Sequence, residues 1–117
     1  MNADFQDRFR KIILKIEESG NSYAEAKADS WYAQEMCSAI RASIQLKAIQ
    51  DDPKISVAKA EMIAKASPEY QQHLEETREK IRAENRAKAE YHKWDASFEG
   101  NRSLSSLEKR TQSLIGD

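Results

Sequence analysis

The sequence predicts an all-α protein, built as an elongated helical hairpin or coiled-coil-like bundle with amphipathic terminal helices. Charged residues make up 33% of the 117 positions, whereas only three residues are Gly and two are Pro. Ala, Glu, Lys, Arg and Gln favour helices and recur throughout. No run alternates apolar with polar residues and is rich in β-branched side chains, so strands are not expected. We expect a single helical domain over 1–117, with helices near 4–19, 22–50, 53–66, 68–98 and 103–115.

The first expected helix, 4–19, has apolar residues at helical spacing and basic residues beside them. Asp4 can cap its start, and Gly20 can end it because glycine is common after the last turn of a helix. The apolar positions are Phe5, Phe9, Ile12, Ile13 and Ile16.

The second helix, 22–50, opens at Ser22 and Glu25, which have the three-residue spacing of a capping box. No helix breaker follows until Pro53. Apolar residues on more than one face indicate two neighbours for this helix. Its candidate positions for contact with a protein partner are Trp31, Met36, Ile40 and Ile44.

The remaining helices have proline or serine at their starts. Asp52 is expected to cap a short helix with Pro53 at its first position, and Ser67 with Pro68 repeats that signal. A bend or a full break near Ser67 is compatible with the sequence. The long helix should end near Gly100, after which Ser105 and Glu108 can form a second capping box for 103–115.

A basic stripe is predicted on the helix 68–98. At 100° per residue, its members fall within about 80° of one another, beside an apolar seam that includes Tyr70, Leu74 and Ile81. The spacing suits phosphate groups or acidic side chains. The members of the stripe are Arg78, Arg82, Arg86 and Lys93.

A solvated helix surface is the alternative interpretation of this stripe. Glu76 precedes Lys80, and Glu84 precedes Lys88, by the four residues that support an exposed helix. The net charge of −1 gives no general basic excess, so any binding of nucleic acid must come from local clustering.

Three aromatic residues, Tyr91, Trp94 and Phe98, follow the basic stripe. Exposed aromatic rings can stack on single-stranded bases, and each stacked base contributes roughly 1–3 kcal/mol. The same spacing of three and four residues is typical of a hydrophobic seam between helices. Stacking, packing and protein contact therefore remain open for these rings.

The sequence does not favour an enzyme, a cofactor or a metal site. His73 and His92 have no metal-ligand spacing, and the three glycines form no phosphate loop. Cys37 is interpreted as a buried reduced thiol. The N-terminus lacks the pattern of a secretory signal, and the apolar runs are far shorter than a membrane span. We expect a cytoplasmic protein and, because a small helical domain buries a modest core, a homo-oligomer.

Three segments carry a resemblance to a known family: Ala60 to Tyr70, Arg86 to Trp94, and Asn101-Arg-Ser. They resemble small helical proteins that tailed bacteriophages encode near recombination and replication genes, and among these the UvsY-type recombination mediators. The run Lys88-Ala-Glu-Tyr-His-Lys-Trp is similar to the basic and aromatic segment with which that family is thought to contact single-stranded DNA.

The resemblance implies an oligomeric accessory protein of the host cytoplasm that binds single-stranded DNA or a DNA-bound protein. It would remodel the coat of single-strand-binding protein and help load a recombinase or an annealing protein. Arg82, Arg86, Lys88 and Lys93 would contact DNA, and Tyr91 or Trp94 would stack on bases. The alternative hypothesis is a helical protein-protein interaction module, such as a phage inhibitor of a host factor or a small assembly protein, with no nucleic-acid binding.

Overall fold

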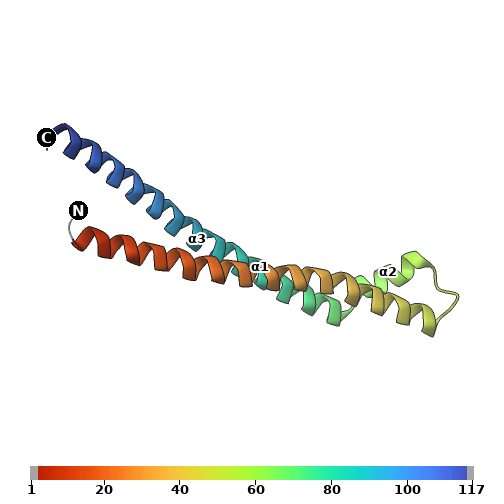
Figure 1. The fold of residues 1–117 in the computed structure, drawn as a ribbon. Coiled ribbons are helices and arrows are strands. Elements are labelled where there is room, and N and C mark those ends of the chain that lie inside the picture. Colours follow the sequence, from red (N-terminus) through yellow and green to blue (C-terminus); the bar gives the residue numbers. More distant parts are fainter. Residues whose placement is uncertain (1–2, 116–117) are drawn as a thin grey trace. The chain divides into compact units, whose positions relative to one another are not determined.

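The computed structural model describes residues 3–115, apart from the side chains of Ser105, Gln112, Ser113 and Ile115. Over these residues the chain forms three helices and no strand (Figure 1). They are α1 (Ala3–Asp51), α2 (Val57–Ala66) and α3 (Pro68–Ile115). The predicted all-α class is confirmed.

The chain divides into two compact units, and both long helices contribute to each. The terminal unit contains residues 1–24 and 86–117, and the central unit contains residues 25–85. In both units α1 and α3 run antiparallel (Figure 1). Phe9 contacts Phe98 in the terminal unit, and Cys37 contacts Thr77 in the central unit. Each unit is therefore built on a helical hairpin.

The predicted break between 4–19 and 22–50 does not occur, because α1 continues through Gly20 and Ser22. Glycine in a helix costs only about 1 kcal/mol relative to alanine, so it permits a helix end without imposing one. Here the Tyr91 ring lies against Gly20, and a Cβ at that position would be 3.4 Å from Tyr91 Cε2. Packing therefore outweighs the local preference.

The predicted end near Gly100 is also wrong, since α3 runs from Pro68 to Ile115 without a break. The Asn101 side chain donates a hydrogen bond to the Ser97 carbonyl at 2.8 Å, within the same helix. The backbone at residues 103–105 is helical, so the capping box expected at Ser105 does not start a separate helix. The Ser105 side chain lies outside the described residues.

The cap of α2 is Ser56 and not Asp52. The Ser56 hydroxyl accepts the Lys59 backbone N–H at 3.1 Å, whereas the Asp52 carboxylate accepts the Lys54 N–H at 3.2 Å and fixes the preceding turn. Helix α2 therefore begins at Val57, later than the predicted residue 53. Its end at Ala66 and the start of α3 at Pro68 agree with the prediction.

Small side chains fill the seam of the central unit. Ser30 is fully buried, and Ala33, Ala60, Ala64 and Thr77 are also buried. Because these side chains are short, α3 approaches the backbone of α1 closely. His73 Nε2 lies 3.1 Å from the Ala33 carbonyl oxygen, which is the geometry of an N–H donor bonded to that oxygen. A polar side chain of one helix thus bonds to the main chain of the other.

Rings fill the seam of the terminal unit. The ring centroids of Phe9 and Phe98 are 5.3 Å apart, and those of Tyr23 and Tyr91 are 6.1 Å apart. These separations are typical of aromatic pairs that stabilise a core. The buried Ser19 hydroxyl donates to the Lys15 carbonyl at 2.6 Å, so its polar group is satisfied within its own helix.

Candidate nucleic-acid and protein-binding surfaces

The basic stripe belongs to both units, and its central-unit members are locally neutralised. Arg78 Nη1 lies 3.0 Å from a Glu75 carboxylate oxygen, and Arg82 forms an ion pair with Glu79. All four side chains are exposed, so these pairs contribute little stability, about 0–1 kcal/mol each. They nevertheless place a carboxylate beside each guanidinium, which weakens its attraction for phosphate.

The expected pairs of Glu76 with Lys80 and Glu84 with Lys88 do not form among the described residues. Glu76 instead lies 3.9 Å from His73 Nδ1 and accepts a hydrogen bond from the Gln72 amide at 3.4 Å. The ion pairs on α3 join residues three apart, and in the arginine and lysine pairs the acidic member comes first.

Arg86 and Lys88 differ from the other basic residues of the predicted site. Both side chains are exposed, and within the described part of the chain neither forms an ion pair. Lys93, one helical turn later, lies 3.9 Å from a Glu90 carboxylate oxygen. Among the predicted basic residues of the site, Arg86 and Lys88 are therefore the two whose charge is not balanced by an ion-paired carboxylate in the described part of the chain.

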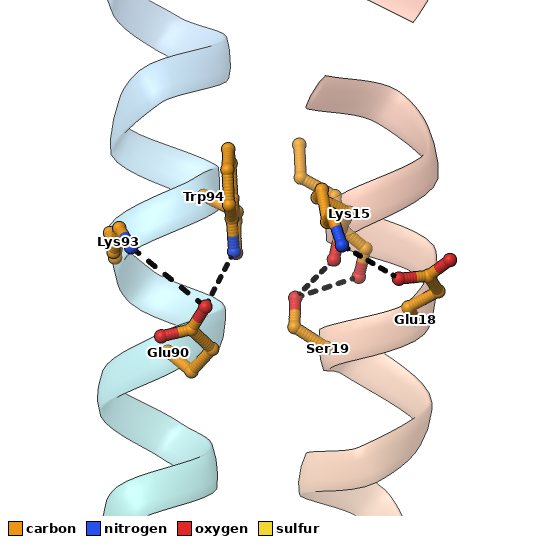
Figure 2. Close-up of polar contacts among 7 residues, drawn as sticks. Lys15, Glu18, Ser19, Glu90, Lys93 and Trp94 are labelled. Carbon is orange, nitrogen blue, oxygen red and sulfur yellow. Dashed lines mark hydrogen bonds and ion pairs between the residues drawn. The ribbon is translucent and has the colours of Figure 1, made fainter. Parts of the chain in front are cut away.

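Trp94 follows Arg86 and Lys88 on α3 and faces α1 (Figure 2). Its indole Nε1 donates to Glu90 Oε1 at 2.8 Å, and Lys93 Nζ lies 5.0 Å from its ring centroid, within the range of a cation–π contact. The half-buried ring lines an open groove of about 220 Å³ between α1 and α3. The other lining residues are Lys15, Glu18, Ser19, Ser22, Ala87 and Glu90.

The other two aromatic candidates are occupied by packing. Tyr91 contacts Gly20 and Tyr23, and Phe98 contacts Phe9, so both rings belong to the seam of the terminal unit. Trp94 instead contacts Glu90 and Lys93 on its own helix and lines the groove. Among the three, Trp94 is the ring that lines an open groove and is not part of a described aromatic pair.

The predicted protein-contact residues do not share one face of α1. Trp31 is 64% exposed, whereas Met36, Ile40 and Ile44 are half-buried. The spacing from the buried Ala33 to Cys37, Ile40 and Ile44 is four, three and four residues. Ile40 and Ile44 therefore lie on the same face of α1 as Ala33 and belong to the inner seam. In the central-unit part of α1, two exposed large apolar residues were missed as candidates: Tyr32 is 62% exposed and Leu46 is 56% exposed.

The described residues contain no group of three or more His, Cys, Asp or Glu side chains that could hold a metal ion. Among the same residues, no helix contains an apolar stretch long enough to cross a membrane. Cys37 is half-buried, with its sulfur 3.3 Å from Thr77 Oγ1.

Comparison of the chain with protein-family models, with curated proteins and with solved structures found no match.

Proposed function

We propose that this chain is a non-enzymatic accessory protein of DNA recombination or replication that binds single-stranded DNA, a DNA-bound protein, or both. The observation that carries the proposal is the position of Arg86 and Lys88, two exposed cations without an ion-pair partner among the described residues, on the same helix as Trp94. The phage origin and the cytoplasm of its host as the place of action come from the family resemblance alone.

In the proposed complex, Arg86 and Lys88 contact phosphates and the Trp94 ring stacks on a base. Single-strand binding commonly combines a basic surface with an aromatic platform, because every base has a π-face and every nucleotide a phosphate. Lys93 contributes less, since Glu90 already lies beside it. Such binding, coupled to a recombinase, an annealing protein or a single-strand-binding protein, would help load the strand-exchange machinery.

The test is a fluorescence-anisotropy titration of a labelled single-stranded oligonucleotide at several salt concentrations, with duplex DNA for comparison. The double variant Arg86→Ala/Lys88→Ala should lower the affinity and reduce the slope of log K against log salt by about 1.4, since each phosphate contact on a single strand contributes about 0.7. Trp94→Ala should weaken binding roughly 5- to 150-fold through loss of stacking.

The matched control is Arg78→Ala/Arg82→Ala, which removes the same charge from the same helix but from cations paired with glutamates. Its salt slope should change by less than half as much. An equal effect of both double variants would reject the assigned site, because it would indicate general electrostatic attraction. Absence of binding by the unmodified protein at low salt would reject direct DNA binding.

A helical protein-interaction module without nucleic-acid binding is the second candidate. It is favoured by the exposure of Trp31 and Tyr32 in the central unit, far above what a core residue shows. In that case Trp31→Ala should abolish capture of the partner, while Arg86→Ala/Lys88→Ala should have no effect on it. A partner retained by the Trp31 variant would rule out this surface.

A further inference from the structure

The outer face of α1 in the central unit has a second heptad-like pattern, offset from the seam that packs against α3. Its positions are spaced alternately by four and three residues, which is the spacing of a helix that contacts another helix along its length. They are Ala28, Tyr32, Glu35, Ala39, Ala42, Leu46 and Ile49. All except the half-buried Ile49 are exposed, and Trp31 is exposed beside them.

This face is unusual for a surface that faces water. Glu35 is the one charged residue among its seven positions, although a third of the chain is charged. Trp31, Tyr32 and Leu46 are 64%, 62% and 56% exposed. Small residues, Ala39 and Ala42, lie between these large ones, so a partner helix could approach closely. Contiguous apolar exposure of this kind marks an interaction surface.

The core of the central unit is slight. Its buried apolar residues, among those that the structure describes, are Ala33, Ala60 and Ala64, and none of them has a large side chain. The large apolar side chains Trp31, Tyr32 and Leu46 of the same unit are instead exposed. A second chain that covered them would add the apolar burial that this unit lacks.

The order of residues along the face is self-complementary. An antiparallel copy, related by a two-fold axis level with the bond between Ser38 and Ala39, places Trp31 level with Leu46 of the second copy. The same operation places Glu35 level with Ala42 of the second copy. Parallel pairing in register would instead set the two Glu35 carboxylates opposite each other, and like charges at such positions repel.

The flanking charges favour the same orientation. Asp29 and Lys47 are about five full turns apart at 3.6 residues per turn, so both lie on the same edge of the face. Both are exposed and, in the described part of the chain, neither forms an ion pair. Antiparallel pairing about this axis places Asp29 of each copy one residue, about 1.5 Å along the helix, from the level of Lys47 of the other copy, a step that the long lysine side chain can span. Parallel pairing in register instead brings like charges together. Opposite charges at interface edges set partner orientation.

We propose that the outer face of α1 is the interface of an antiparallel homodimer, with Tyr32, Ala39 and Leu46 along its centre line and Trp31 beside it. This assignment concerns the central unit and is independent of DNA binding by the terminal unit. A face that pairs with itself in this way forms a closed, isologous contact, so the assembly through this surface stops at two copies.

Sedimentation equilibrium tests the interface. The unmodified protein should have about twice its 13.4 kDa mass at micromolar concentration. Ala39→Glu should sediment as a monomer with unchanged helical circular dichroism, because Ala39 is exposed within each chain and two added carboxylates would lie close to the axis. The control is Ala89→Glu, the same change at an exposed position of α3, which should leave the mass doubled. A monomeric unmodified protein, or an Ala39→Glu variant with doubled mass, would overturn the proposal.

Disulfide cross-linking tests the orientation in a Cys37→Ser background. Chains carrying Glu35→Cys, mixed with chains carrying Ala42→Cys, should form the mixed disulfide on mild oxidation, because antiparallel pairing brings these positions level. Formation of Glu35→Cys homodisulfides in preference to the mixed species would establish parallel pairing and overturn the antiparallel assignment. Absence of any cross-link in a protein that sediments as a dimer would place the interface elsewhere.

Discussion

Tyr91 lies against Gly20, and a Cβ placed on that glycine would be 3.4 Å from the Tyr91 Cε2 atom. The glycine is inside α1, where it has a negative φ and supplies no turn. Its lack of a side chain lets the ring sit close to the backbone of α1, and this contact anchors α3 in the terminal unit. At Gly100, by contrast, a Cβ would meet nothing within 4 Å.

Gly20→Ala and Gly100→Ala should each stabilise the protein, because 3.4 Å is ordinary van der Waals contact and alanine favours a helix by about 1 kcal/mol over glycine. Gly20→Leu should destabilise it, since the larger side chain would displace the Tyr91 ring. Thermal denaturation followed by circular dichroism measures all three. A stabilising Gly20→Leu would show that the ring does not rest on this position.

If the protein binds single-stranded DNA as proposed, Glu90→Gln should increase its affinity for that DNA. The Glu90 carboxylate accepts the Trp94 indole N–H at 2.8 Å and lies 3.9 Å from Lys93 Nζ, so it places a negative charge within the proposed phosphate site. Gln keeps a hydrogen-bond acceptor for Trp94 while removing that charge. We expect roughly a threefold gain at low salt, from Coulomb repulsion of one charge at close range in a largely aqueous surrounding.

The control for this variant is Glu99→Gln, which removes the same charge from the same helix at a residue paired with Arg102 at 3.8 Å. It should change the DNA affinity less than Glu90→Gln does. Equal gains from both variants would mean that net charge, and not the position of Glu90, sets the affinity.

Tyr91→Ala and Trp94→Ala should separate stability from binding. Tyr91 contacts Gly20 and Tyr23, so its truncation removes core packing and should cost about 3–5 kcal/mol, as deletion of a packed aromatic ring does. Trp94 lines an open groove and should cost less. Urea denaturation gives the free energy of unfolding, and anisotropy gives the DNA affinity at a temperature where both variants are folded. A Trp94 variant that loses as much stability as the Tyr91 variant would assign Trp94 to the core.

Ala33→Leu should destabilise the central unit by about 1–3 kcal/mol, the usual effect of adding methylene groups to a filled seam. The Ala33 carbonyl lies 3.1 Å from His73 Nε2, so α3 would have to move away from α1 to admit a larger side chain. Ala89→Leu, at an exposed position of α3, is the matched control and should be close to neutral. Chemical denaturation of the two variants provides the comparison.

The helical class could be predicted because it depends on composition and periodicity, which are local properties of the chain. The start of α3 at Pro68 and the end of α2 at Ala66 were also predictable. Proline has no backbone N–H to donate, and it restricts the backbone conformation of the residue before it. The breaks expected at Gly20 and Gly100 were not, because a glycine costs a helix only about 1 kcal/mol and long-range packing decides.

The candidate sites were predictable as residue types but not as contacts. Arg82 and Arg86 have the same spacing on the stripe, yet Arg82 is paired with Glu79 and Arg86 has no ion pair among the described residues. Likewise Tyr91 and Trp94 both follow the seam spacing, and the contacts with Gly20 and Tyr23 identify Tyr91 as core. The rotamer of each side chain and the pairing of the helices decide which contacts such residues make. Neither can be derived from the spacing of residues in the sequence.

The order in which the two units can close follows from the hairpin. His73 reaches back to Ala33 across 40 residues, whereas the Phe9 to Phe98 contact of the terminal unit closes a loop more than twice as long. Loop closure costs about 0.6 kcal/mol of entropy for each doubling of length. We therefore expect α1 and α3 to pair first in the central unit, next to α2, and last in the terminal unit. The terminal unit should then exchange its amide hydrogens first. A ligand bound by Arg86 and Trp94 would slow that exchange, because it would stabilise the terminal unit, the last part of the hairpin to form.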